Sequence, residues 1–215
     1  SSAMFIKFCG FTRPDDIEAV RDLPVSAVGF VFYPGSRRYI SPRKAIDLSR
    51  MLHLSGKEKI GVFVESPADE IIDICQCVNL DRIQLYDPSL FGILQGYLPL
   101  IRSYRIREAA DLEKITEPGR DDLILLDAFR PDQYGGTGES FDWRYLKDFP
   151  YLDRTIIAGG INEGNLARLL RTVSPYGLDI SSGIEEAPGK KSAALMRQIL
   201  QLLNEVKDYE TITGQ

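Results

Sequence analysis

Short apolar runs alternate with longer stretches of helical periodicity along nearly the whole chain. The runs predict eight strands, with the sequences FIKFC, SAVGFVF, KIGVFV, RIQLY, LPLIRSY, DLILLD, RTIIAG and YGLDIS. Apolar residues spaced three and four apart predict helices over residues 14–22, 42–54, 67–78, 88–95, 107–116, 142–149, 162–172 and 190–208,. Several of these helices open with proline, which favours the first helical position.

This regular alternation predicts the fold class. Strands that alternate with helices pair in parallel through right-handed crossovers, as in α/β proteins. Eight such units in about 205 residues fit a compact (β/α)8 TIM barrel, whose lower size limit is about 200 residues,. An open doubly wound sheet is the alternative, and the number of units disfavours it. In a barrel, function resides in the loops that follow the strands.

The domain organisation is simple. No linker rich in serine and glycine and no block of like charges interrupts the pattern, so we predict one catalytic barrel domain over residues 4–208,. Residues Ser1 to Ala3 precede Met4 and resemble a cloning remnant, and residues 209–215 form a polar tail without a recognisable signal,.

Charge and hydropathy argue against two classes of partner, nucleic acids and membranes. The formal net charge is -5 over 215 residues, which argues against a nucleic-acid partner, because such a partner requires a basic stripe,. No apolar stretch is long enough to span a membrane, and no signal segment opens the chain. We therefore expect a cytoplasmic protein in which local groups bind any anionic ligand.

The metal-ligand residue types are scarce. Three cysteines and a single histidine, His53, give no disulfide framework, no histidine-based metal site and no serine–histidine triad,. Cys75 and Cys77 lie in a predicted helix, where we interpret both as packing residues. We expect no metal. A redox or metal protein built on these two cysteines stays as an alternative, although further ligands are missing.

The first strand places unusual residues inside the barrel. Side chains alternate along a strand, so Ile6 and Phe8 face the helices while Lys7 and Cys9 face the lumen,. The same alternation places further side chains in the lumen, namely Gln84, Tyr86, Leu125, Asp127, Asp179 and Ser181. We expect Cys9, Tyr86, Asp127 and Ser181 to converge at the strand ends. Deeper down, Lys7, Gln84 and Asp179 should satisfy one another, because buried charges need partners.

Three loops after strands suggest ligand contacts. AGGINEGN and DISSGIEEAPGKK follow the seventh and eighth strands, where barrels often bind phosphate through backbone N–H groups,. The loop GFVFYPGSRRYISP offers Arg37 and Arg38, and one of them could hold a carboxylate with its planar guanidinium,. The long loop AFRPDQYGGTGESFDW could fold over a ligand,.

These motifs together resemble one family. KFCG, GFVFYPGSRRYISP, IGVFV, IQLY, LLDAFRPDQYGGTGESFDW, AGGINEGNL and DISSGIEEAPGKK resemble, in order, the motifs of phosphoribosylanthranilate isomerase, an enzyme of tryptophan biosynthesis. The resemblance implies a barrel that needs no cofactor. It also implies an Amadori rearrangement of N-(5'-phosphoribosyl)anthranilate, a small phosphorylated substrate, to 1-(2-carboxyphenylamino)-1-deoxyribulose 5-phosphate.

The resemblance also implies roles for individual residues. Cys9 matches the family's general base, Asp127 its general acid, and Arg38 the arginine that holds the anthranilate carboxylate. Asp179 matches an aspartate that contacts the substrate or braces the site. The phosphate loops match at Gly159, Gly160, Ser181, Ser182 and Gly183. Catalysis then requires a Cys9 thiolate, which Lys7 or a bound iminium would favour, and an Asp127 with a raised pKa.

The family pattern leaves questions open. Where the family commonly has Q-L-H-G, this chain has QLYD, with Tyr86 in place of the histidine. One alternative is the related isomerase of histidine biosynthesis, but that enzyme has an aspartate at the position of Cys9 and two phosphate loops. Another is a barrel that binds a phosphorylated ligand without chemistry. Also open are fusion to, or association with, indole-glycerol-phosphate synthase, and whether Lys7 tunes Cys9 or pairs with Asp179.

Overall fold

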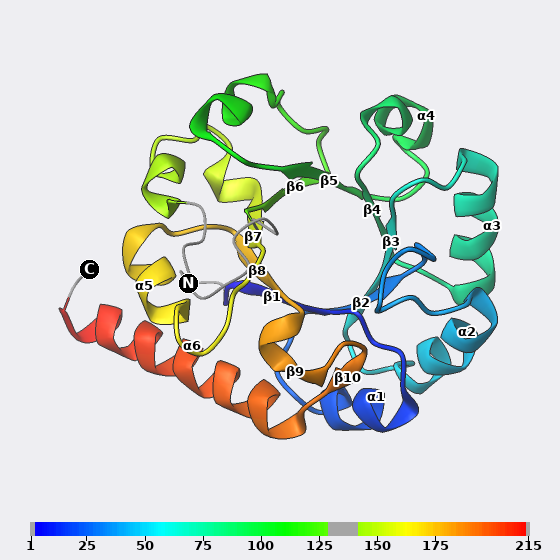
Figure 1. The fold of residues 1–215 in the computed structure, drawn as a ribbon, viewed down its shortest axis with the longest axis horizontal. Helices are drawn as coiled ribbons and strands as arrows, with labels where there is room; N and C mark the ends of the chain where they lie inside the picture. Colours follow the sequence, from blue (N-terminus) through cyan, green and yellow to red (C-terminus); the bar gives the residue numbers. More distant parts are fainter. Residues whose placement is uncertain (1–2, 129–141, 214–215) are drawn as a thin grey trace.

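The computed structural model describes residues 3–128 and 142–213, without the side chains of residues 208–213. Eight parallel strands form a closed barrel in chain order, which confirms the predicted fold and rules out the open sheet. Figure 1 looks along the barrel and shows the strands as a ring inside a shell of helices. The strands are β1 (Phe5–Cys9), β2 (Ala27–Val31), β3 (Glu58–Phe63), β4 (Arg82–Leu85), β5 (Leu100–Arg105), β6 (Leu123–Asp127), β7 (Thr155–Ala158) and β8 (Gly177–Ile180).

The first and last strands close the ring. β1 pairs with β2 on one side and with β8 on the other, so Lys7 stands level with both Ala27 and Asp179. This pairing brings the loop after β8 beside the first strand, although the two are far apart in sequence.

Six α-helices form most of the shell over the described residues. They are α1 (Pro14–Arg21), α2 (Pro42–Met51), α3 (Ala68–Val78), α4 (Phe91–Leu94), α5 (Leu166–Thr172) and α6 (Ala193–Thr213). Pro14 and Pro42 occupy first-turn positions as predicted, and Ser41 caps α2 by accepting a hydrogen bond from the Lys44 amide at 3.3 Å,.

Several predicted helices are shorter than expected, and some form 3₁₀ turns instead of α-helices. Residues 107–116 form only the 3₁₀ helix η2 (Ala109–Lys114), which buries no side chain and so lacks the apolar face that stabilises a short α-helix,. Residues 142–149 form η4 (Trp143–Leu146), and Pro150 follows closely and prevents extension,. Residues 88–95 split into η1 (Pro88–Leu90) and α4, and two further single turns are η5 (Leu152–Arg154) and η6 (Ser182–Ile184).

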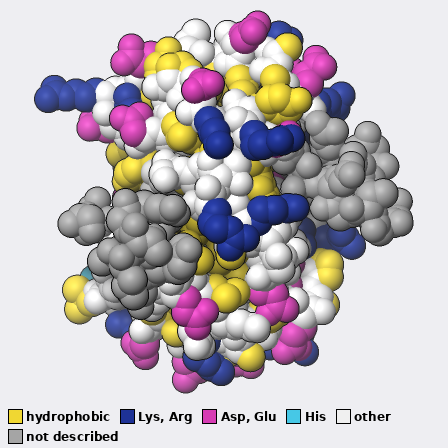
Figure 2. Space-filling view, turned by 90° about the vertical axis from the view of Figure 1, so that its left-hand side faces the viewer, with side chains coloured by type: hydrophobic (Ala, Val, Ile, Leu, Met, Phe, Trp, Pro, Cys, Tyr) yellow, Lys and Arg dark blue, Asp and Glu magenta, His cyan; other side chains and the backbone are white. Residues whose placement is uncertain are grey.

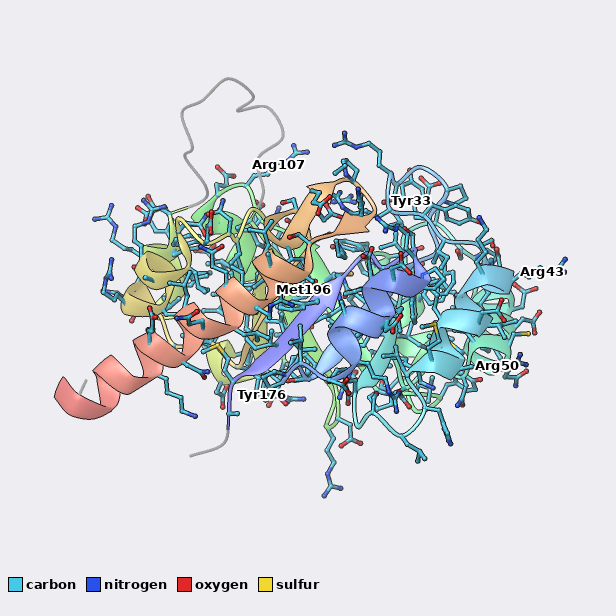
Figure 3. The ribbon with its side chains drawn as sticks, turned by 90° about the horizontal axis from the view of Figure 1, so that it is seen from below. Tyr33, Arg43, Arg50, Arg107, Tyr176 and Met196 are labelled. Carbon is cyan, nitrogen blue, oxygen red and sulfur yellow. The ribbon has the colours of Figure 1, made fainter. Side chains whose placement is uncertain are left out.

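The last predicted helix begins late. A short antiparallel hairpin, β9 (Glu185–Ala187) and β10 (Lys190–Lys191), precedes α6. Gly189 turns it with a φ of 83°, a left-handed conformation that favours glycine,. In Figure 3 this hairpin lies at the same end of the barrel as Tyr33 and Arg107, with Tyr176 at the opposite end. The hairpin is therefore part of the face where the strands end.

Two apolar layers support the barrel. The larger lies between strands and helices and includes Ile6, Phe8 and the fully buried Met196 of α6 (Figure 3). The smaller lies in the lumen and consists of Ala27, Ile60, Ile101, Leu123, Leu125, Ile156 and Ala158. This division confirms the predicted alternation of β1 and the inward position of Leu125, and it makes the lower lumen a packed core.

The outer surface is mixed in character. On the face formed by α5 and the end of α6, basic, acidic and hydrophobic side chains are intermixed, and the basic ones gather near the middle (Figure 2). Among the described residues, none of the helices combines the length and hydropathy that a bilayer crossing requires.

Candidate active site at the carboxyl ends of the strands

A fully buried lysine lies just below the strand ends. Lys7 Nζ donates to Gln84 Oε1 at 2.8 Å and to Asp179 Oδ2 at 2.9 Å, which confirms that Lys7 is bonded to both predicted partners. Burial disfavours the ammonium form, but the negative charges of Asp179 and Cys9 outweigh it and raise the pKa of Lys7,. The other carboxylate oxygen, Asp179 Oδ1, is buried and accepts no hydrogen bond within the part of the chain that the structure describes.

Cys9 lies directly above this lysine. Its side chain is buried, and a Cβ placed on Gly29 would lie 2.5 Å from Cys9 Sγ and 3.0 Å from Lys7 Cε. Glycine at position 29 therefore makes room for both side chains. Burial raises the pKa of the Cys9 thiol, and the opposing charge of Lys7 does not outweigh it,. Lys7 thus acts on Cys9 and Asp179 together, and by itself it does not bring the pKa of Cys9 below its ordinary value.

Asp127 and Tyr86 stand on the other side of the lumen. Asp127 ends β6, half-buried, level with Arg105 of β5 and Ala158 of β7. Burial and the charges of Asp127, Asp179 and Cys9 raise the pKa of Tyr86, so its hydroxyl lies in the field of all three groups. The Arg105 guanidinium lies 4.8 Å from the centre of the Tyr86 ring, a cation–π distance,. Tyr86 is therefore a neutral hydroxyl at this mouth, and the charges of both proposed catalytic residues raise its pKa.

The loops after β7 and β8 are packed together. Gly159 and Gly160 have φ values of 101° and 68°, and a Cβ on Gly183 would lie 2.1 Å from the Ile161 carbonyl oxygen. Only glycine permits this turn and this contact. The Ser181 hydroxyl, by contrast, donates to the Cys9 carbonyl oxygen at 3.0 Å and so connects this loop to β1.

Arg38 lies above the turn that follows Cys9. Gly10 has a φ of 90°, and a Cβ there would lie 2.9 Å from Arg38 Cδ. The Arg38 guanidinium makes an ion pair of 2.7 Å with Glu185 of the hairpin, while Arg37 is exposed. Arg38 is thus held beside the proposed base, with a partner that the sequence did not predict.

Three further residues near the site, Glu185, Lys191 and Arg105, are not among those predicted from the sequence. Lys191 has a side-chain exposure of 0% and donates to Glu185 at 3.0 Å. The Pro-Gly turn between two charged pairs in GIEEAPGKK was the available signal for a hairpin, although it does not reveal which charges are buried,. For Arg105, a charge at the end of a strand was the available signal.

The remaining cysteines differ from each other. Cys75 is buried, and burial raises its pKa to about 12, which confirms a packing role. Cys77 is exposed, so the packing prediction for it is wrong, because residues two apart on a helix face different directions,. No set of three potential metal ligands occurs within residues 3–128 and 142–213. Most of the long loop predicted to cover a ligand lies outside the described residues.

Known proteins resemble this chain over nearly its full length. The family model of N-(5'phosphoribosyl)anthranilate (PRA) isomerase matches residues 6–202. The isomerase of Rubrobacter xylanophilus is 36% identical over 199 residues, which cover 91% of this chain and 96% of that protein. The isomerase of Pelobacter propionicus is 34% identical over 207 residues, covering 96% and 98%.

Solved structures agree with the sequence relatives. Phosphoribosyl anthranilate isomerase from Thermotoga maritima superposes with a TM-score of 0.82 at 32% identity, covering 94% of this chain and 100% of that one. A structure of the same enzyme type in complex with reduced 1-(o-carboxyphenylamino)-1-deoxyribulose 5-phosphate gives 0.79 at 30% identity, with the same coverage. The chain therefore belongs to the N-(5'-phosphoribosyl)anthranilate isomerase family, whose members are aldose–ketose isomerases of tryptophan biosynthesis.

Proposed function

We propose that this chain converts N-(5'-phosphoribosyl)anthranilate into 1-(2-carboxyphenylamino)-1-deoxyribulose 5-phosphate, with Asp127 as general acid and Cys9 as general base. The observation that carries the proposal is the placement of Cys9 and Asp127 as the last residues of β1 and β6, two strands of one closed parallel barrel, so both lie at the same mouth. An acid and a base on opposite sides of one lumen can serve two atoms of one sugar.

The reaction begins with ring opening. Protonated Asp127 donates its proton to the furanose ring oxygen, the bond between that oxygen and C1 breaks, and the nitrogen lone pair forms a Schiff base. The resulting iminium acidifies the proton on C2. Cys9, as thiolate, removes that proton and leaves an enolamine. The enol hydroxyl proton then moves to C1 to give the ketone, and exchange with water restores both residues. The substrate gains one proton and loses one, so the isomerisation is balanced.

The iminium supplies an additional positive charge that favours the Cys9 thiolate. Burial raises the pKa of Cys9 despite the nearby Lys7 ammonium, so the thiolate is scarce before ring opening. A second positive charge forms beside the thiol only when the Schiff base forms, and it favours the thiolate at the moment when a base is needed. Lys7 adds to this field and is neutralised in part by Asp179.

The surrounding residues bind the substrate. The buried Asp179 Oδ1 is placed to accept a hydrogen bond from a sugar hydroxyl, while Oδ2 braces Lys7,. The packed loops of Gly159, Gly160, Ser182 and Gly183 bind the phosphate through their backbone N–H groups. Arg38 binds the anthranilate carboxylate.

The test is a fluorescence assay that follows the loss of phosphoribosylanthranilate. We expect wild-type turnover without added metal or cofactor. The variants Cys9→Ala and Asp127→Asn should each lose about 10²- to 10⁴-fold in kcat, because each removes one proton-transfer group, while their thermal unfolding stays close to wild type. His53→Ala changes an exposed residue and serves as the control. Near-normal kcat in Cys9→Ala would show that the base is another group.

One observation favours a second candidate, a barrel that binds the ligand without chemistry. Tyr86 stands where the resemblance implies a histidine, and the charges of both catalytic candidates raise its pKa. Tight binding of the reduced product by the wild type, with no turnover at any pH, would establish this candidate and contradict the isomerase.

A further inference from the structure

Glu185 is the centre of a buried ionic cluster. Its side chain is 3% exposed and accepts bonds from Arg38 at both carboxylate oxygens, with Nε at 3.0 and 3.1 Å and Nη2 at 2.7 Å. Lys191 Nζ and the Gly189 amide each donate to Oε2 at 3.0 Å. We call Arg38, Glu185 and Lys191 the Arg38 cluster.

The geometry leaves one side of the arginine for another carboxylate. Guanidinium has five N–H donors in a planar fork. Glu185 occupies the side formed by Nε and Nη2, so the donors of Nη1 and the second donor of Nη2 point elsewhere. Within the described residues, all side-chain hydrogen bonds of Arg38 go to Glu185. The Arg38 side chain is 23% exposed, so Glu185 and its neighbours do not cover it completely.

The charges of the cluster match a single incoming carboxylate. Arg38 with Glu185 alone is a neutral pair, which gains little from a second anion. Burial lowers the pKa of Lys191, while the charge of Glu185 opposes that shift; with Lys191 protonated, the three residues together carry a net charge of +1. Burial opposes the ionisation of Glu185, but the bonds from Arg38 and the charge of Lys191 outweigh it and hold the pKa of Glu185 below its ordinary value,.

The cluster is joined to the strand that carries the proposed base. Lys191 Nζ also donates to the Cys9 carbonyl oxygen. The Lys191 amide donates to Asp16 Oδ2 at 3.0 Å, and the Thr12 hydroxyl donates to the Gly189 carbonyl oxygen at 2.6 Å. The hairpin is therefore docked against the start of the chain. Any group held by Arg38 has a fixed position relative to Cys9.

We propose that Glu185 and Lys191 are positioning residues for carboxylate recognition by Arg38, a role that rests on the proposed function. Glu185 sets the direction of the guanidinium, and Lys191 keeps the cluster positive and fixes it to β1. Neither residue touches the reacting atoms. The ligand class is an aromatic carboxylate on a phosphorylated pentose.

The test compares two ligands by calorimetry. One is the reduced product, and the other is the same molecule without its carboxylate. We expect the wild type to prefer the first by about 10- to 100-fold, because the carboxylate accepts charge-assisted hydrogen bonds. Glu185→Gln and Lys191→Met should each lose most of that preference, while affinity for the ligand without carboxylate stays close to wild type. In turnover, KM should rise more than kcat falls.

The chain offers matched controls next to the cluster. Glu186 and Lys190 form an exposed pair, with side-chain exposures of 53% and 51%. Glu186→Gln and Lys190→Met should leave the preference unchanged. If Glu185→Gln proves too unstable to measure, Glu185→Asp takes its place. Because it keeps the negative charge, Glu185→Asp should retain part of the carboxylate preference. Equal loss of affinity for both ligands, or an unchanged preference in Glu185→Gln and Lys191→Met, would overturn the proposal.

Turnover and carboxylate preference, both measured in the wild type, separate the two proposals. A carboxylate preference without turnover in the wild type contradicts the proposed chemistry and leaves the positioning role intact. A wild type that turns the substrate over without any carboxylate preference contradicts the positioning role alone.

Discussion

The two sides of the barrel mouth are built differently. On the side of β1 and β8, the side chains of Lys7, Asp179 and Glu185 are nearly inaccessible. Lys7 is hydrogen-bonded to Asp179, and Glu185 is bonded to Arg38 and Lys191. On the side of β4 and β5, Tyr86 is half-buried and packs against the exposed Arg105. Directional bonds between buried charges accept few replacements, whereas a stacked ring accepts other shapes. Tyr86, where the sequence differs from the Q-L-H-G pattern that the resemblance implies, lies on this second side.

The largest effect is expected for Lys7→Met. Removing the ammonium leaves Asp179 buried without its counter-charge and Gln84 without its donor. Breaking a buried pair in this way costs about 3–5 kcal/mol of unfolding free energy, measurable by urea denaturation. The double variant with Asp179→Asn should recover part of the lost unfolding free energy, because no buried carboxylate is then left without a counter-charge. If Lys7→Met lost no more unfolding free energy than the same change at an exposed lysine, the side of β1 and β8 would not be the rigid one.

Next in size is Gly29→Ala. The added methyl group would lie 2.5 Å from Cys9 Sγ, so the thiol or the strand must move. Overpacking of this kind costs about 1–3 kcal/mol and should also lower kcat, because the proposed base is displaced. Gly92→Ala in α4 is the control, since nothing lies within 4 Å of its added Cβ. Similar unfolding curves and rates for both variants would contradict the close packing.

Low pH should weaken the ionic contacts of Glu185, on the side of β1 and β8. The folded pKa of Glu185 lies below its ordinary value of 4.5, so the folded state binds the proton less well than the unfolded chain. The resulting stability is present above pH 4.5 and is lost as the pH falls through the folded pKa,. Glu185→Gln should lack this part of the acid dependence in urea titrations, while Glu186→Gln follows the wild type. Parallel curves for wild type and Glu185→Gln would contradict the assignment.

The smallest loss of stability is expected on the side of β4 and β5, where Arg105 packs on Tyr86. Arg105→Met removes a cation–π contact at an exposed position, worth about 0.5–1 kcal/mol,. Tyr86→His introduces the histidine that the resemblance implies at this position and should preserve both fold and turnover. A loss from Tyr86→His as severe as that from Asp127→Asn would mean that the tyrosine hydroxyl takes part in the reaction.

The sequence predicted the features that follow from local pattern. Alternation along β1 placed Lys7 and Cys9 in the lumen, and the need of a buried charge for partners identified Gln84 and Asp179. Other features depend on contacts distant in sequence. Residues 109–114 failed to form an α-helix because they bury nothing, and the burial of Glu185 and Lys191 follows from docking against β1. Single-sequence patterns carry no information on such docking.

The position of the Arg38 cluster also orders events during synthesis. The ribosome produces Cys9 and Arg38 early, and Glu185 and Lys191 only after all eight strands. A growing chain therefore holds its proposed base and the arginine proposed to bind the carboxylate long before it can orient them. Since Lys191 bonds to the Cys9 carbonyl oxygen, the arginine gains its fixed direction only when β8 and the hairpin dock onto β1. Carboxylate binding is thus a readout of barrel closure, and it could follow the last stage of folding in a chain still attached to the ribosome.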